Sequence, residues 1–155
     1  MPPHTAAVES YWMPFTANRD YKEKPRVFVG AEGHHYLTED GRKVYDAFSG
    51  LWTSGIGHCH PRIVEAVQKQ VATLDYSMGF QAGSDRVFEL AEKLTSMAPE
   101  GFTRVFFTNS GSESADTSLK IALAFHRASG EGHRTRLIGR EKGYHGVNFG
   151  GMSVG

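Results

Sequence analysis

The sequence predicts an α/β protein with parallel strands, and three observations point to this class. From Pro61 onward the expected elements run helix, helix, strand, helix, strand, an order typical of a parallel sheet covered by helices. Short strands separated by turns precede this region, at residues 27–45. Many of the 18 glycines lie in short runs with polar residues, and such runs usually mark tight turns around a site.

The composition fits a soluble globular protein, either one domain or a piece of a larger one. Of the 155 residues, 39% are hydrophobic and 22% are charged, which are ordinary values. Lys and Arg together number 17, as do Asp and Glu, and the zero net charge argues against nucleic-acid binding. The single cysteine excludes an internal disulfide and favours a reducing compartment. Without a signal-peptide pattern or a membrane-length apolar stretch, the cytoplasm is the expected location.

The N-terminal elements are short. Residues 27–45 predict a meander of strands whose turns are the segments AEG and EDG, because Gly and acidic residues favour hairpin turns. The apolar contributors of this meander are Tyr36, Leu37, Val44, Tyr45 and Phe48. The segment SGLWTSGIGHCH that follows holds too many glycines for regular structure.

Two helices are expected next. Pro61 begins a helix through about Leu74, and the apolar face of this helix consists of Ile63, Val64, Val67 and Val71. A second helix begins after Ser84, an N-cap candidate, and ends before Pro99. The residues that this helix is expected to direct to the core are Val87, Leu90, Ala91 and Leu94.

The remaining elements are two strands and a helix. Residues 103–108 (TRVFFT) predict a strand, followed by a helix through about Ala128. Residues 134–139 (RTRLIG) predict a second strand, followed by the loop EKGYHGVNFGG. Two strands do not complete a doubly wound domain, so either the chain is a fragment or its class differs.

The turn between the first of these strands and its helix has the chemistry of a phosphate site. The first N–H groups of a helix have no partner within the helix, and the helix dipole adds partial positive charge there. Gly111 lets an oxyanion approach the backbone, and Ser110 and Ser112 add hydroxyl donors. The lysine of a P-loop and the glycine spacing of a dinucleotide site are both absent. The alternative is that Ser110 or Ser112 is simply the N-cap of the helix.

A second motif, GYHG at residues 143–146, places Tyr144 and His145 between two glycines just after a predicted strand. Such a loop lies at the carboxyl edge of a parallel sheet, the same edge as the Ser-Gly-Ser turn. A tyrosine there can offer its flat face to a planar heteroaromatic ligand. The alternative is a loop tyrosine that covers the core.

Together, FFTNSGSESADTSLKIA and GYHG resemble the class III family of pyridoxal-phosphate aminotransferases. The resemblance extends to DGRKVYDAFSGLW and GIGHCHPRIVEAV, and YWMPFTANRDY is similar to the ω-amino acid–pyruvate (β-alanine–pyruvate) branch. It implies the N-terminal part of a type I aminotransferase fold, with residues 1–60 in the small domain and residues 61–155 beginning the large cofactor-binding domain. It further implies a homodimer that transfers an amino group between an ω-amino acid or amine and a 2-oxo acid such as pyruvate.

The resemblance also assigns the cofactor-binding residues. Ser110, Gly111 and Ser112 match the segment that binds the phosphate of pyridoxal phosphate. Tyr144 matches the aromatic residue that stacks on the pyridine ring, and His145 lies beside it.

Three further residues carry implied roles. Glu113 is expected near the cofactor or capping the helix, and Trp52 matches an aromatic residue of the substrate pocket. Phe80, in YSMGFQ, falls near a residue that such enzymes contribute to the pocket of the neighbouring subunit.

No residue of this chain matches the catalytic lysine of the family, which forms the Schiff base and comes much later in the chain. The seven lysines here are Lys22, Lys24, Lys43, Lys69, Lys93, Lys120 and Lys142. The 155-residue chain is therefore expected to be inactive by itself. The alternatives that remain are a truncated cofactor-phosphate half-site without turnover and a simple phosphate-ligand binding module.

A metal site is not expected. His58, Cys59 and His60 suggest zinc ligands, but structural zinc sites normally space their ligands as C-x-x-C or H-x-x-x-H. This turn offers two ligands at best, and no partner cluster is evident in the sequence. We expect it to lead into the helix at Pro61, and we expect His34 and His35 to form part of a strand.

Overall fold

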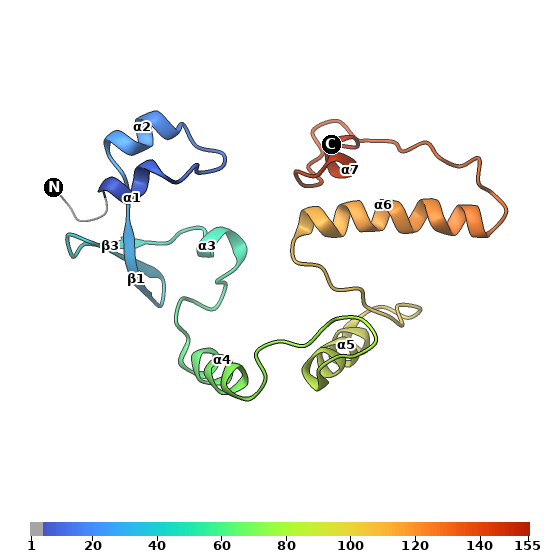
Figure 1. Cartoon of the computed structure of the whole chain (residues 1–155), viewed down its shortest axis with the longest axis horizontal. Helices are drawn as coiled ribbons and strands as arrows, with labels where there is room; N and C mark the ends of the chain where they lie inside the picture. The colour runs from blue at the N-terminus through green and yellow to red at the C-terminus, as the bar shows by residue number, and fades with distance from the viewer. Residues whose placement is uncertain (1–4) are drawn as a thin grey trace. The chain divides into compact units, whose positions relative to one another are not determined.

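The computed structural model describes residues 5–155. They form two compact units, one ending at Met78 and the other beginning at Gly79, and Figure 1 labels the elements of each. The domain boundary expected at residue 60 concerns the complete protein and stays a prediction.

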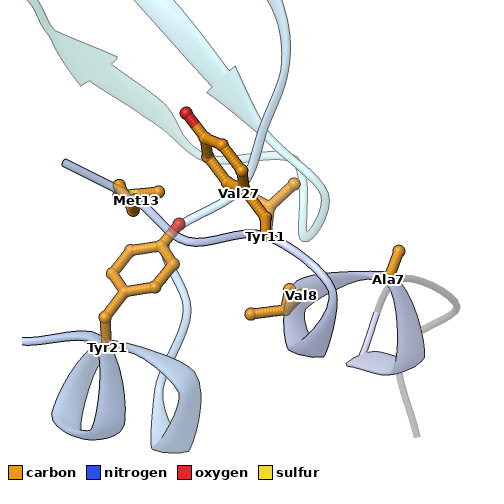
Figure 2. A pocket seen from close by; sticks show the side chains of 6 residues that line it. All are labelled: Ala7, Val8, Tyr11, Met13, Tyr21 and Val27. Carbon is orange, nitrogen blue, oxygen red and sulfur yellow. The ribbon is translucent and has the colours of Figure 1, made fainter.

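Two short helices that the sequence did not predict open the first unit: α1 (Thr5–Glu9) and α2 (Asn18–Glu23). Lys22 Nζ holds them together, because it lies 3.1 Å from Glu9 Oε2 and 2.9 Å from the Glu9 carbonyl oxygen. Beside these helices is an apolar pocket of about 190 Å³ (Figure 2), lined by Ala7, Val8, Tyr11, Met13, Tyr21 and Val27. Since no charged side chain lines this pocket, we assign it to packing of the N-terminal segment.

The predicted meander is confirmed. Strands β1 (Phe28–Glu32), β2 (His35–Thr38) and β3 (Lys43–Tyr45) form an antiparallel sheet in the order β1-β2-β3. Phe28 stacks on Tyr36 across the first pair of strands, with ring centroids 4.4 Å apart. This sheet supports the glycine-rich segment that follows β3.

The three predicted longer helices are also confirmed: α4 (Pro61–Thr73), α5 (Asp85–Met97) and α6 (Gly111–Ala128). Pro61 occupies the first turn of α4 as expected. Ser84 occupies the N-cap position of α5, but its side chain makes no capping hydrogen bond.

The expectation that α5 directs Val87, Leu90, Ala91 and Leu94 to a core is wrong within the described part of the chain, and the apolar face of α4 is exposed as well. Ile63 and Val67 of α4 are exposed, as are Val87 and Leu94 of α5. Among residues 5–155, Val154 is the only large hydrophobic side chain that is buried. A helix face is buried only when a second layer packs on it, and neither α4 nor α5 meets such a layer.

The two strands predicted at residues 103–108 and 134–139 are wrong as well. Neither segment is assigned to a helix or a strand, and neither pairs with the other or with a described strand. A strand depends on hydrogen bonds to a neighbour, and an apolar β-like pattern cannot supply that neighbour. The only sheet in residues 5–155 is the N-terminal meander.

Two short helical turns lie in segments predicted to be irregular: α3 (Ser49–Trp52) and α7 (Phe149–Met152). The chain after α6 runs back along that helix, so that α7 lies beside its first turns (Figure 1). None of the helices described is both long and apolar enough to cross a membrane.

Candidate functional site

The first turn of α6 is capped by its own side chains. Ser110 is the N-cap, and its Oγ accepts a hydrogen bond from the Glu113 N–H at 3.1 Å. The Glu113 carboxylate in turn accepts the N–H of Asn109 at 2.9 Å. This reciprocal arrangement is a variant of the capping box. Ser110 is therefore the N-cap of α6, and its hydroxyl oxygen accepts a hydrogen bond from the helix itself.

The caps leave two backbone donors free. Gly111 and Ser112 occupy the first two helical positions, where an N–H has no partner within the helix, and no described residue accepts from either. A methyl group placed on Gly111 would meet no atom within 4 Å. An anion can therefore approach these two N–H groups closely, at the positive end of the dipole of an 18-residue helix.

The loop that carries Tyr144 is fixed against this same turn. Ser112 Oγ accepts the N–H of Val147 at 3.0 Å, and Asp116 Oδ1 accepts the N–H of Gly151 at 2.9 Å. Gly146 has φ +94°, and a Cβ there would lie 2.6 Å from Ser112 Cα. Only glycine permits this approach, so loop and helix are in direct backbone contact.

Between the helix and the loop is a pocket of about 370 Å³, lined by Gly111, Ser112, Ala115, Tyr144, His145 and Gly146. Four of the six predicted cofactor residues (Gly111, Ser112, Tyr144 and His145) thus meet at one place, although the predicted strands that were to position them do not form. Tyr144 is 75% exposed, so its ring retains a face for a planar ligand. The donor set and the open ring suit a phosphorylated aromatic molecule.

The two substrate-pocket candidates lie elsewhere in the chain. Trp52 ends α3 in the first unit and is 86% exposed. Phe80 precedes α5 in the second unit and is 74% exposed. Both are large aromatic side chains open to contact, and neither lines the pocket beside Tyr144.

The histidines and the cysteine before α4 do not gather into a cluster. His58 Nε2 bonds to Asp46 Oδ2 at 2.7 Å, and Cys59 is exposed. In the part of the chain that the structure describes, no three His, Cys, Asp or Glu side chains lie close enough together to hold a metal ion. The turn leads into α4 at Pro61.

Sequence reasoning missed Asp116 and Gly146 as parts of this site. Asp116 lies four residues after Ser112, which places both side chains on the same face of a helix. This spacing was a usable signal. The sequence predicted that the loop of residues 143–146 lies at the same edge as the Ser-Gly-Ser turn, but it did not indicate that Gly146 would be in direct contact with Ser112, since that contact is made by the return of the chain along α6.

Comparison with known proteins identifies the family. The sequence profile of the Aminotransferase class-III family matches residues 16–155. The chain therefore belongs to the class III aminotransferases.

Two curated relatives are similar over almost the whole chain. The omega-aminotransferase of Caulobacter vibrioides is 55% identical over 148 residues, which cover 96% of this chain and 34% of the relative. The beta-alanine–pyruvate aminotransferase of Pseudomonas aeruginosa is 53% identical over 148 residues, with coverage of 96% and 33%. The chain thus spans about a third of the length of the curated relatives it matches.

Solved transaminases share the fold. A thermostable omega transaminase from Pseudomonas jessenii, in a four-fold mutant form, matches with a TM-score of 0.92 and 31% identity, covering 99% of this chain and 35% of that one. An amine transaminase from an uncultivated Pseudomonas species, in its PLP-bound form, matches with a TM-score of 0.87 and 37% identity, with coverage of 94% and 33%. The fold of this chain is therefore part of the type I aminotransferase fold.

Proposed function

We propose that the complete protein is a pyridoxal-phosphate-dependent transaminase that moves an amino group between an ω-amino acid or amine and a 2-oxo acid such as pyruvate. The observation that carries this proposal is the pair of unpartnered N–H groups on Gly111 and Ser112, in a pocket that Tyr144 also lines. A cofactor that carries both a phosphate and an aromatic ring fits both features, with its phosphate at the two N–H groups and its ring against Tyr144. The names of the relatives, an omega-aminotransferase and a beta-alanine–pyruvate aminotransferase, support the substrate class.

The residues present divide the binding of the cofactor between them. The N–H groups of Gly111 and Ser112 donate to the phosphate. The Ser112 hydroxyl can donate as well, because its bond from Val147 uses only an acceptor position of the oxygen. Ser110 and Glu113 act indirectly, by capping the helix whose N-terminus binds the anion.

Tyr144 holds the ring of the cofactor. It offers a stacking face, and His145 lies beside it in the same pocket. When bound, the cofactor supplies an electron sink for bond changes at the amine carbon. None of the site residues of this chain is assigned a proton-transfer role, since the resemblance places the catalytic lysine outside its seven lysines.

Substrate contact is proposed for two exposed aromatic residues. Trp52 forms a wall of the amine pocket, and Phe80 reaches the pocket of a second copy, which requires a homodimer. The resemblance to the family supports this role, and at 86% and 74% exposure both side chains are accessible, as are most large apolar side chains of the described residues. We also propose the cytoplasm as the location of the complete protein, in keeping with the single cysteine among these 155 residues.

The test uses the full-length protein. β-Alanine and an aryl alkyl amine are each supplied with pyruvate, and formation of alanine is measured in the presence of pyridoxal phosphate. Alanine formation that requires the cofactor is the expected result. Absence of alanine from every amine tried would overturn the substrate class. Native cofactor affinity in both Tyr144→Ala and Ser112→Asp would overturn the placement of the site.

A further inference from the structure

The residues before Trp52 adopt an unusual backbone. Ser49, Gly50, Leu51 and Trp52 have φ values of +50°, +60°, +58° and +72°. Four consecutive left-handed residues, three of them not glycine, form a turn that L-amino acids rarely adopt, because the Cβ of each approaches a carbonyl oxygen. Such a conformation persists only where its surroundings impose it, and it is often found at functional sites.

The carboxylate of Asp46 imposes this turn. Asp46 Oδ1 accepts the N–H of Phe48 at 3.1 Å, and Oδ2 accepts the N–H of Gly50 at 2.7 Å. Two hydrogen bonds to one carboxylate fix the direction in which the chain leaves β3. The turn then closes with the N–H of Trp52 donating to the Phe48 carbonyl at 2.9 Å.

His58 holds the carboxylate from the other side. Its Nε2 lies 2.7 Å from Asp46 Oδ2, and the two side chains are only 13% and 6% exposed. Partial burial raises the pKa of Asp46, but the hydrogen bonds from His58 and from the backbone of Gly50 and Phe48 outweigh it and lower the pKa below its ordinary value. Hydrogen bonds from the protein therefore stabilise the charged form of this mostly buried carboxylate.

The sheet anchors His58 in turn. The backbone of His58 exchanges two hydrogen bonds with Gly33, of 3.1 Å and 2.7 Å, and its ring centroid lies 4.5 Å from that of Tyr36. At Gly57, φ is +93° and a Cβ would lie 3.0 Å from the Gly33 carbonyl oxygen. A continuous set of contacts thus runs from the β1–β2 turn through His58 and Asp46 to the left-handed turn.

We infer that Asp46 and His58 are positioning residues that set Trp52 in the substrate pocket. The inference rests on the proposed function for the role of Trp52, but the coupling between the pair and the backbone that carries Trp52 rests on the contacts above. Neither residue touches substrate or cofactor in this proposal. Each acts only through the turn that ends at Trp52.

The first experiment reads the position of Trp52 without any assay of activity. The full-length protein is labelled with 5-fluorotryptophan, and the ¹⁹F resonance of residue 52 is assigned by its loss in Trp52→Phe. Asp46→Ala and His58→Ala are expected to shift or broaden this resonance. His58→Gln, which keeps an N–H donor, is expected to change it less. The matched control is Asp40→Asn, since Asp40 lies in the same meander and bonds only to Thr38 and Arg42.

The second experiment measures the KM for the amine substrate. Asp46→Ala is expected to raise the KM for the amine by about 10- to 100-fold, the effect of a misplaced contact far from the chemistry, while cofactor affinity stays native. When Asp46→Ala is combined with Trp52→Ala, it is expected to raise the KM little further, because both substitutions remove the same contribution to substrate binding. Full additivity, or an unchanged resonance in both alanine variants, would overturn the inference. If the wild type transfers no amino group at all, the proposed function fails while the resonance still tests the positioning.

Discussion

Ser112 Oγ accepts the backbone N–H of Val147 at 3.0 Å, a bond between residues 35 positions apart in the sequence. It fixes the loop of Tyr144 to the first turn of α6. The two halves of the candidate cofactor site, one for an anion and one for a ring, are therefore directly joined by a hydrogen bond.

Gly146→Ala is expected to destabilise the protein and to weaken cofactor binding. At φ +94° an alanine is strained, and its Cβ would lie 2.6 Å from Ser112 Cα. Left-handed strain alone costs about 1–2 kcal/mol, and the clash adds to it. Gly101→Ala is the matched control, because Gly101 has φ +93° with nothing within 4 Å of a Cβ. Thermal unfolding of both variants without cofactor measures the extra loss of stability caused by the clash with Ser112. Equal losses of stability in the two variants would contradict the clash.

Gly111→Ala is expected to separate binding from stability. The space around a Cβ at residue 111 is open, and alanine is the better helix former, so the apo protein should be no less stable. The methyl group occupies the approach of the phosphate and should weaken cofactor binding by about 1–3 kcal/mol, the cost of a lost hydrogen bond to a charged group. Equilibrium dialysis measures the affinity. Native affinity in this variant would argue against an anion at the start of α6.

Tyr144→Ala is expected to lose about 1–3 kcal/mol of cofactor affinity, by analogy with stacking of bases on aromatic side chains. Tyr144→Phe keeps the ring and should bind nearly as well as the wild type. Ser112→Asp should be worse than either, since it sets a carboxylate against the phosphate and removes the hydroxyl that accepts from Val147. If Tyr144→Phe loses as much as Tyr144→Ala, the phenolic hydroxyl and not the ring face is responsible.

Asp46 is expected to make stability depend on pH in the acid range. Its pKa is lowered in the folded protein by hydrogen bonds from His58, Gly50 and Phe48, which outweigh partial burial. A lowered pKa stabilises the fold above the unfolded value of about 3.9, and this stability is lost as the pH falls through the folded pKa. The wild type should therefore exceed Asp46→Asn in unfolding free energy by the largest amount at neutral pH, and this difference should decrease below about pH 4.

Urea unfolding of the full-length protein between pH 3 and pH 7 measures this difference. Asp75→Asn is the control, because no described residue bonds to the Asp75 side chain. A difference that is constant across the range would mean that the charge of Asp46 is unimportant to the fold.

Residues 1–155 expressed alone are expected to transfer no amino group. The resemblance places the catalytic lysine elsewhere, and Lys142, although only two residues before Tyr144 in the sequence, does not line the pocket of Tyr144. Exposed apolar faces on α4 and α5 should also make this piece prone to aggregate. Borohydride reduction with pyridoxal phosphate, followed by mass spectrometry, identifies any labelled lysine. Stoichiometric labelling of one lysine together with amine-dependent turnover would contradict this prediction.

The sequence by itself determined the local structure and the family. Apolar spacing, Pro61 and the Ser-Gly-Ser turn predicted α4, α5 and α6, because helix periodicity and capping depend on residues within a few positions of one another. The turns AEG and EDG predicted the meander for the same reason. The motifs around Gly111 and Tyr144 indicated a phosphate and a ring in one site, and both residues line one pocket.

Only the tertiary structure decided which distant residues meet. The apolar runs at residues 103–108 and 134–139 have the pattern of strands, but no segment of the described residues 5–155 pairs with either of them, and pairing is a property of two segments, not of one. No local pattern predicts that Gly146 contacts Ser112. Nor does one predict the hydrogen bonds by which Asp46 and His58 hold the turn that ends at Trp52. Contacts between residues far apart in sequence depend on how the whole chain folds back on itself, so they are seen only once that path is known.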